Sequence, residues 1–233
     1  MIEKTLKTTT GKLTVSIPGN LTEVTLGQMI ALQEKTELSD LDAISILSGI
    51  PVPELQSVRN VDDFAVFAEA VLSLSYQVKY LYSSDSIPKT ITFHNGNKKT
   101  AVKVMNNLAV EPAGAFFAAR EIIADEIKDA VKQHGETDWQ QNFNPSLKAC
   151  AQVLAHYFFC RATGKPYNEY EAEEFVAEIK KLRVTEALPI AKHFFMRFPH
   201  LSGTRTGFFH RLQQRWRKRQ EYRLLKNLNM STP

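Results

Sequence analysis

Two stretches of alternating hydrophobic and polar residues predict two short β-hairpins. In residues 2–17, the runs "IEKTLKT" and "KLTVSIP" lie on either side of "TTTG", whose glycine favours a turn. In residues 89–104, two further alternating runs lie on either side of Asn95-Gly96, a dipeptide that accepts the positive φ angles of a type I′ turn. We therefore expect two antiparallel hairpins, one at the start of the chain and one near its middle.

Most of the remaining chain has hydrophobic residues at the helical spacing of three and four. Thr25 and either Ser39 or Asp40 are the predicted N-caps of the first two helices, and Gly49 ends the second. The whole pattern predicts an α+β fold that is predominantly helical, with helices after each hairpin. The predicted helices cover residues 24–35, 39–49, 52–58, 61–82, 112–135, 147–164, 171–182 and 185–198, followed by a basic helix and tail at 208–233.

The strongest helical pattern runs from about Val61 to Tyr82. Its apolar residues recur at spacings of three and four, which is the spacing of a heptad seam. One interpretation is an ordinary core helix, because three heptads do not require a coiled coil. The other is a seam for self-association or for binding a partner helix. The candidate seam consists of Phe64, Phe67, Val71, Leu74, Val78 and Leu81.

Charge is distributed unevenly along the chain. The net charge is +4, yet residues 200–233 hold eight Lys or Arg and one Glu, which leaves 21 bases and 24 acids elsewhere, a balance of −3. A basic nucleic-acid-binding domain carries positive charge over a face of its fold. The acidic body therefore argues against that class, and the basic character belongs to the C-terminal segment.

The sequence "HRLQQRWRKRQEYRLLKNL", residues 210–228, predicts a basic C-terminal docking helix. Such a helix suits an acidic protein surface, a phosphate backbone or an anionic membrane, and a solvated, partly frayed terminal helix is the alternative. The candidate binding residues are the apolar Phe208, Phe209, Leu212 and Trp216 and the arginines at every fourth position, Arg211, Arg215, Arg219 and Arg223.

Sequence motifs for catalysis, phosphate binding or metal binding are weak or absent. No nucleophile elbow of the Gly-x-Ser-x-Gly kind occurs, and "ATGKPY" has too few glycines to hold a phosphate. Cys150 and Cys160 share one predicted helix about 15 Å apart, beyond disulfide reach, so we expect buried, reduced thiols. Of these cysteines only Cys160 shares a helix face with His156, which gives too few ligands for zinc. We therefore expect no catalytic residue, metal, cofactor or small-molecule substrate.

The organisation of the chain follows from its composition. No apolar run approaches the roughly 20 residues that cross a bilayer, and the N-terminus lacks the apolar core of a signal peptide. We expect a soluble protein made in a cytoplasm, without a membrane partner. The first predicted part, 1–84, holds the first hairpin and its helices, and the second, 85–198, holds the second hairpin and its helices. We expect these two parts to pack together as one body. A linker at 199–207 and the basic helix and tail at 208–233 follow.

Two segments carry a family resemblance. Residues 24–74, with "VTLGQMIALQEK", "DLDAISILSGIPVPELQSV" and "VDDFAVFAEAVLSL", resemble the N-terminal region of tail assembly chaperones and related tail-morphogenesis proteins of long-tailed bacteriophages and prophages. Residues 108–197, with "GKPYNEY" and "EALPIAKHFF", are similar to uncharacterised proteins of phages that infect Bacteroidetes. The resemblance implies a non-enzymatic protein that holds the long apolar helices of a tape-measure protein in the host cytoplasm during assembly.

Two alternatives to the chaperone stay open. One is a structural virion component, such as a neck, tail or baseplate ring or adaptor, which forms a cyclic oligomer of copies of itself and remains in the particle. The other is a nucleic-acid-binding protein that acts through residues 205–226, with an affinity that falls steeply as salt rises. The acidic body places the second alternative last.

Overall fold

The computed structural model of the chain describes residues 1–78, 80, 86–95, 98–105, 107–108, 111–135, 139 and 143–197. The chain divides into two compact units, Met1–Leu201 and Ser202–Pro233, and the described residues all belong to the first. The predicted linker at 199–207 and the basic helix and tail at 208–233 lie outside the described residues. The described part is α+β and predominantly helical, with two two-stranded antiparallel sheets, which confirms the predicted fold class.

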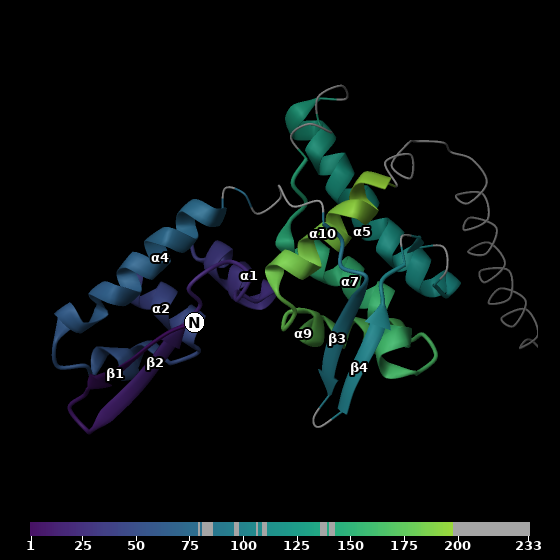
Figure 1. Ribbon diagram of the computed structural model, residues 1–233. Coiled ribbons are helices and arrows are strands. Elements are labelled where there is room, and N and C mark those ends of the chain that lie inside the picture. Colours follow the sequence, from purple (N-terminus) through teal and green to yellow (C-terminus); the bar gives the residue numbers. More distant parts are fainter. Residues whose placement is uncertain are drawn as a thin grey trace, which may run out of the picture. The chain divides into compact units, whose positions relative to one another are not determined.

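The first predicted hairpin is present. Strands β1 (Ile2–Lys7) and β2 (Lys12–Ile17) pair antiparallel over their full length (Figure 1). The side chains of Leu6, Val15 and Ile17 are buried, and β2 packs against helix α2 (Asp40–Ser48). The alternation of the sequence thus becomes one apolar face on the core and one polar face in water.

The predicted caps set the ends of the next helices, α1 (Leu26–Glu34), α2 and α3 (Val52–Gln56). The Thr25 hydroxyl accepts the backbone N–H of Gln28, whose own side chain accepts the N–H of Thr25 in return. Ser39 forms the same capping box at the start of α2, which resolves the choice between Ser39 and Asp40. Gly49 ends α2 in the left-handed conformation, with φ of 74°.

The helix predicted from Val61 begins with a different geometry. Residues Val61–Phe64 form a short 3-10 helix. At its start, the backbone N–H of Asp62 donates a hydrogen bond to the side-chain oxygen of Asn60. Helix α4 (Ala65–Val78) follows and packs against α2. The predicted end of this helix near Tyr82 lies outside the described residues.

The second predicted hairpin is also present. Strands β3 (Thr90–Asn95) and β4 (Lys98–Lys103) pair antiparallel, from Thr90 opposite Lys103 to Asn95 opposite Lys98, and the turn predicted at Asn95-Gly96 lies partly outside the described residues. In the observed register Ile91 lies opposite Val102, and both side chains are buried. The apolar residues of the two strands thus share the face of the hairpin that packs on the core.

Helix α7 (Leu147–Thr163) is the centre of the second half of the body. It contacts α5 (Ala113–His134), α10 (Val184–Arg197), strand β4 and helix α1 (Figure 1). Eleven of its seventeen residues are buried, and they include every residue from Val153 to Phe159. A helix that is apolar on all sides has to lie inside the protein, and α7 does.

The helix predicted over residues 171–182 is broken into two. Helix α8 (Glu169–Glu174) begins two residues earlier than predicted, because the Asn168 side chain caps it, and α9 (Val176–Ile179) follows Phe175. The Phe175 ring lies 5.4 Å from the Phe93 ring and 6.0 Å from the Phe159 ring, measured between centroids. The break thus accompanies an aromatic cluster that joins α8, α7 and β3.

Backbone hydrogen bonds tie α1 to the segment that follows α9. The N–H groups of Leu26 and Gly27 donate to the carbonyls of Leu182 and Lys180, both at 2.8 Å. A Cβ on Gly27 would lie 3.1 Å from both the Cβ and the carbonyl oxygen of Lys180, so glycine permits this close approach. The contact holds the first turn of α1 against the segment that follows α9.

Candidate functional site

The predicted partner-binding seam of α4 faces the interior of the described body. Phe67 and Leu74 are 0% and 5% exposed and belong to the hydrophobic core. Phe64, Val71 and Val78 are half-buried and pack against that core, and Leu81 lies outside the described residues. The five described seam residues are therefore used for internal packing. This agrees with the interpretation of the pattern as an ordinary core helix.

The opposite side of α4, which we call the outer face, exposes apolar side chains among Glu69, Ser73 and Ser75. Leu72 and Tyr76 are 56% and 59% exposed, and Val66 is 37% exposed. Glu69 is the single charged residue in the fourteen residues of the helix. A helix on the surface of a monomeric protein normally carries charged residues on its solvent face, so the outer face of α4 is a candidate binding surface.

The predicted docking residues of the C-terminal segment lie outside the described residues. They are Phe208, Phe209, Leu212, Trp216, Arg211, Arg215, Arg219 and Arg223. Their role in binding stays a prediction from the sequence.

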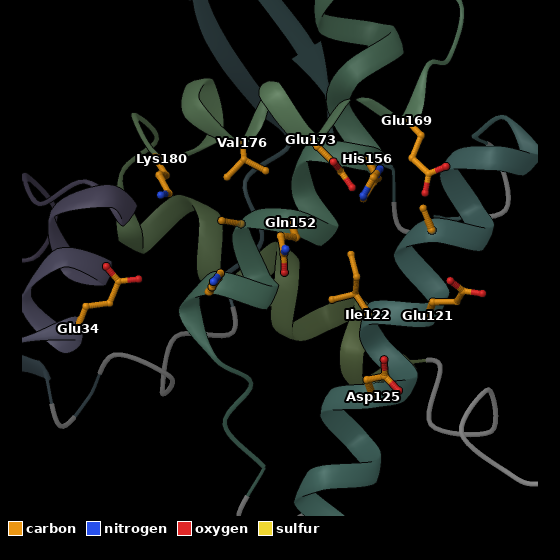
Figure 2. Close-up of a pocket in the computed structure, with 13 residues that line it drawn as sticks. Glu34, Glu121, Ile122, Asp125, Gln152, His156, Glu169, Glu173, Val176 and Lys180 are labelled. Atoms are coloured by element: carbon orange, nitrogen blue, oxygen red, sulfur yellow. The ribbon is translucent and has the colours of Figure 1, made fainter. Parts of the chain in front are cut away.

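A pocket with an internal volume of about 620 Å³ lies among α1, α5, α7, α8 and α9 (Figure 2). Ile122, Ala151 and Gln152 line it, together with the ring of His156. Lys148 and Lys180 also contribute. Its most frequent lining group is the carboxylate, contributed by Glu34, Glu121, Asp125, Glu169 and Glu173.

The carboxylates of this acidic pocket come from three separate helices. Glu34 is at the end of α1, Glu121 and Asp125 lie one turn apart on α5, and Glu169 and Glu173 lie one turn apart on α8. All five side chains are solvent-exposed. None of them forms an ion pair with a lysine or arginine among the described residues. With five carboxylates against Lys148 and Lys180, the pocket has a net negative rim.

His156 forms the buried part of the pocket. It is 5% exposed, and its Nδ1 lies 3.0 Å from the hydroxyl of Tyr167. Burial lowers the pKa of His156, while the charges of Glu169 and Glu173 act in the opposite direction. Figure 2 shows Glu173 directed toward the His156 ring. The neutral imidazole is thus the form that the pocket favours.

Tyr167 is held by a close approach to helix α5. A Cβ on Gly114 would lie 2.7 Å from the Tyr167 ring, so any larger residue there would displace the ring. Burial raises the pKa of Tyr167 to about 12, and the hydroxyl therefore stays protonated as a hydrogen-bonding group. This packing fixes the Tyr167–His156 pair and with it the orientation of the imidazole.

A second polar cluster joins α7 to the end of the β3–β4 hairpin. The Met105 N–H donates to the Tyr157 hydroxyl, which donates back to the Met105 carbonyl, both at 2.7 Å. Arg161 Nη2 lies 2.5 Å from Oε1 of the buried Glu111, although this oxygen has no aligned hydrogen-bond donor among the described residues. Burial raises the pKa of Glu111, and Arg161 opposes that shift. We interpret this cluster as structural, because it is packed between elements.

Both cysteines and the candidate metal ligand His156 lie in the described part of the chain. Cys150 is buried and free, and burial raises the pKa of its thiol; Cys160 is also free but only half-buried. The described residues contain no group of three or more His, Cys, Asp or Glu positioned to hold a metal ion. Within the same residues, no helix combines the length and the apolar character of a membrane span.

Sequence reasoning missed the acidic pocket. Its carboxylates lie far apart along the chain and, taken separately, each resembles an ordinary solvated helix residue. The one available signal was His156, a polar residue within the otherwise apolar run from Val153 to Phe159. Comparison with protein-family models, with curated proteins and with solved structures finds no match.

Proposed function

We propose that this chain is a non-enzymatic phage tail-morphogenesis protein, a tail assembly chaperone that binds apolar helical segments of a tape-measure-like partner. The family resemblance of residues 24–74 and 108–197 supports the class of protein. The outer face of α4 is the observation that carries the binding role, since it offers exposed apolar side chains outside the internal core.

The exposed apolar side chains of the described body are concentrated in one region. Of the ten large hydrophobic residues that are exposed, five lie within the twenty residues from Val61 to Tyr80. Scattered single apolar residues are normal on a protein surface, whereas a concentration of them marks an interaction site. This concentration favours a protein partner with an apolar surface of its own.

The spacing on the outer face suits a helical partner. Leu72 and Tyr76 lie one turn apart on α4, with Ser73 between them. Such anchors form a ridge to which the apolar stripe of an amphipathic helix binds, and the small serine lets the two backbones approach. Tyrosine is enriched at protein interfaces because its ring is apolar and its hydroxyl remains hydrated.

The proposal is tested by co-expressing the chain with the tape-measure protein encoded in the same genome. We expect the wild-type chain to keep that protein in the soluble fraction and to co-purify with it. Val66→Lys/Leu72→Lys should reduce the co-purified amount at least tenfold, because the new ammonium groups disrupt an apolar contact, a change of about 1.4 kcal/mol or more. Leu38→Lys/Tyr170→Lys is the matched control, with two exposed apolar residues outside α4.

Two results would contradict the proposal. Equal co-purification by the outer-face and control variants would show that α4 does not bind the partner. Stoichiometric amounts of the chain in purified virions would exclude a chaperone and favour the structural component of the particle. Circular dichroism of each variant establishes that it remains folded.

A further inference from the structure

Glu69 lies in the middle of the outer face of α4. It is exposed, and Val66 and Leu72 lie three residues before and after it, so that they are its neighbours on the helix surface. Within the described residues its carboxylate forms no ion pair and no hydrogen bond. An acidic group without a partner thus lies between the apolar side chains to which we assign the binding role.

The charge of Glu69 restricts what can cover this face. A helix that packs on both Val66 and Leu72 removes water from the carboxylate between them. Burial of a carboxylate without a partner opposes binding, whereas an opposite charge with aligned donors offsets the lost hydration. The outer face therefore favours a partner that brings a cation to Glu69 and disfavours one that is apolar throughout.

A second copy of the chain offers no such cation from the same face. Residues 61–78 contain Asp62, Asp63 and Glu69 but neither lysine nor arginine. Two outer faces packed on each other would therefore bring carboxylates together, with no base in either α4 helix to neutralise them. The charge of this face thus argues against a second copy and for a different partner that is basic at the point of contact.

We infer that Glu69 selects amphipathic helices that carry a lysine or arginine within their apolar stripe. The aliphatic part of such a side chain packs on Val66 or Leu72, and its charged end donates to the Glu69 carboxylate. A helix that is apolar at this position leaves Glu69 unpaired, and one that is acidic there repels it. The inference rests on the proposed function, since it concerns the same face, and it names the chemistry of the partner helix.

The test uses the full chain and three synthetic amphipathic helices of identical length. They differ only at one position in the middle of the apolar stripe, which is Lys, Gln or Glu. Fluorescence anisotropy should show that the wild-type chain binds the Lys helix about tenfold more tightly than the Glu helix, with the Gln helix between them. Glu69→Gln should lose this preference and Glu69→Lys should reverse it. Raising the salt concentration should reduce the preference, because salt screens the charges.

The control variant is Glu174→Lys. It makes the same charge change as Glu69→Lys at an exposed glutamate on α8. We expect it to keep the wild-type preference for the Lys helix, and circular dichroism establishes that each variant is folded. A control that loses the preference as fully as Glu69→Lys would show that net charge acts and not the position of Glu69, which overturns the inference.

Three further results would overturn the inference. The first is equal affinity of the wild-type chain for all three helices; if Val66→Lys/Leu72→Lys still weakens their binding, the outer face binds helices without selection by charge, and the proposed function is unaffected. The second is no binding of any of the helices, in which case co-purification with the tape-measure protein decides the proposed function separately. The third is self-association of the wild type in sedimentation velocity that Leu72→Lys abolishes, which would make a second copy the occupant of the outer face.

Discussion

Helices α4 and α7 have similar apolar sequences but different surroundings. In α7 eleven of seventeen residues are buried, although the helix contains Lys148 and Arg161. In α4 only Phe67, Ala70 and Leu74 of fourteen residues are buried, although its single charged residue is Glu69. The helix with fewer charges is thus the more exposed one.

This difference identifies the apolar surface that no other element covers within the described body. The apolar sides of α7 are covered by α5, α10, α1 and β4, so its composition is explained by the core. One side of α4 is covered by α2 and the core, and its outer face has no such explanation within the described body. The contrast supports a folding role for both helices and leaves the outer face of α4 as the surface that we propose binds a partner.

The largest expected effect tests the folding role of α7. Phe158 is 0% exposed, with ring centroids 5.4 Å from Phe93 and 4.7 Å from Tyr157. Phe158→Ala should lower the free energy of unfolding by about 3–5 kcal/mol, because it removes buried surface and leaves a cavity. Urea denaturation measures the change. Tyr170→Ala, at a residue 79% exposed, should change it by no more than about 0.5 kcal/mol.

A Phe158→Ala variant as stable as Tyr170→Ala would mean that α7 is not the centre of the core. The comparison with α4 would then lose its basis, since the two helices would no longer differ in their contribution to stability.

The two faces of α4 are compared by one pair of leucines. Leu74 is 5% exposed and Leu72 is 56% exposed on the same helix. Leu74→Ala should lower the free energy of unfolding by about 2–5 kcal/mol, and Leu72→Ala by less than about 0.5 kcal/mol. The composition and helix propensity change identically in both variants, so urea denaturation isolates burial. Equal losses would show that the outer face is also covered, which would remove α4 as a binding surface.

The sequence predicts the local features of this fold well. Thr25, Ser39 and Gly49 act as predicted because a cap depends on groups within a few residues of itself. The second hairpin is also predicted, but the pairing of Ile91 with Val102 is not, because it depends on a core assembled from distant elements. The break at Phe175 has the same origin, since its ring packs against Phe93 and Phe159.

The candidate sites were less accessible to prediction. The spacing from Phe64 to Val78 correctly identifies an apolar side of α4, but spacing alone does not say whether that side meets the core or a partner. The acidic pocket depends on Glu34, Glu121 and Glu169, which are brought together by the contacts of α1 with residues 180–182 and of α5 with α7 and α8. Such long-range placement is absent from a local pattern.

The smallest expected effect is the pH dependence contributed by His156 on α7. Because burial lowers its pKa in the folded protein, the unfolded chain takes up a proton first as the pH falls below about 6.5. The stability due to neutral His156 is therefore complete above that pH and is lost as the pH falls through the folded pKa. His156→Gln should lose less stability than the wild type between pH 7 and pH 5, by about 1.4 kcal/mol for each unit of pKa difference.

Glu173 and Glu174 sharpen this measurement, because they are neighbours on α8 and only Glu173 lines the pocket and acts on His156. Glu173→Gln removes a charge that raises the pKa of His156, so its stability should fall more steeply with decreasing pH than that of Glu174→Gln. Denaturation curves at several pH values, together with the NMR titration of the His156 ring, measure both effects. If the His156 ring titrated identically in the two variants, the charge of Glu173 would have no effect on the pKa of His156. The contribution of α7 to the pocket would then be packing alone.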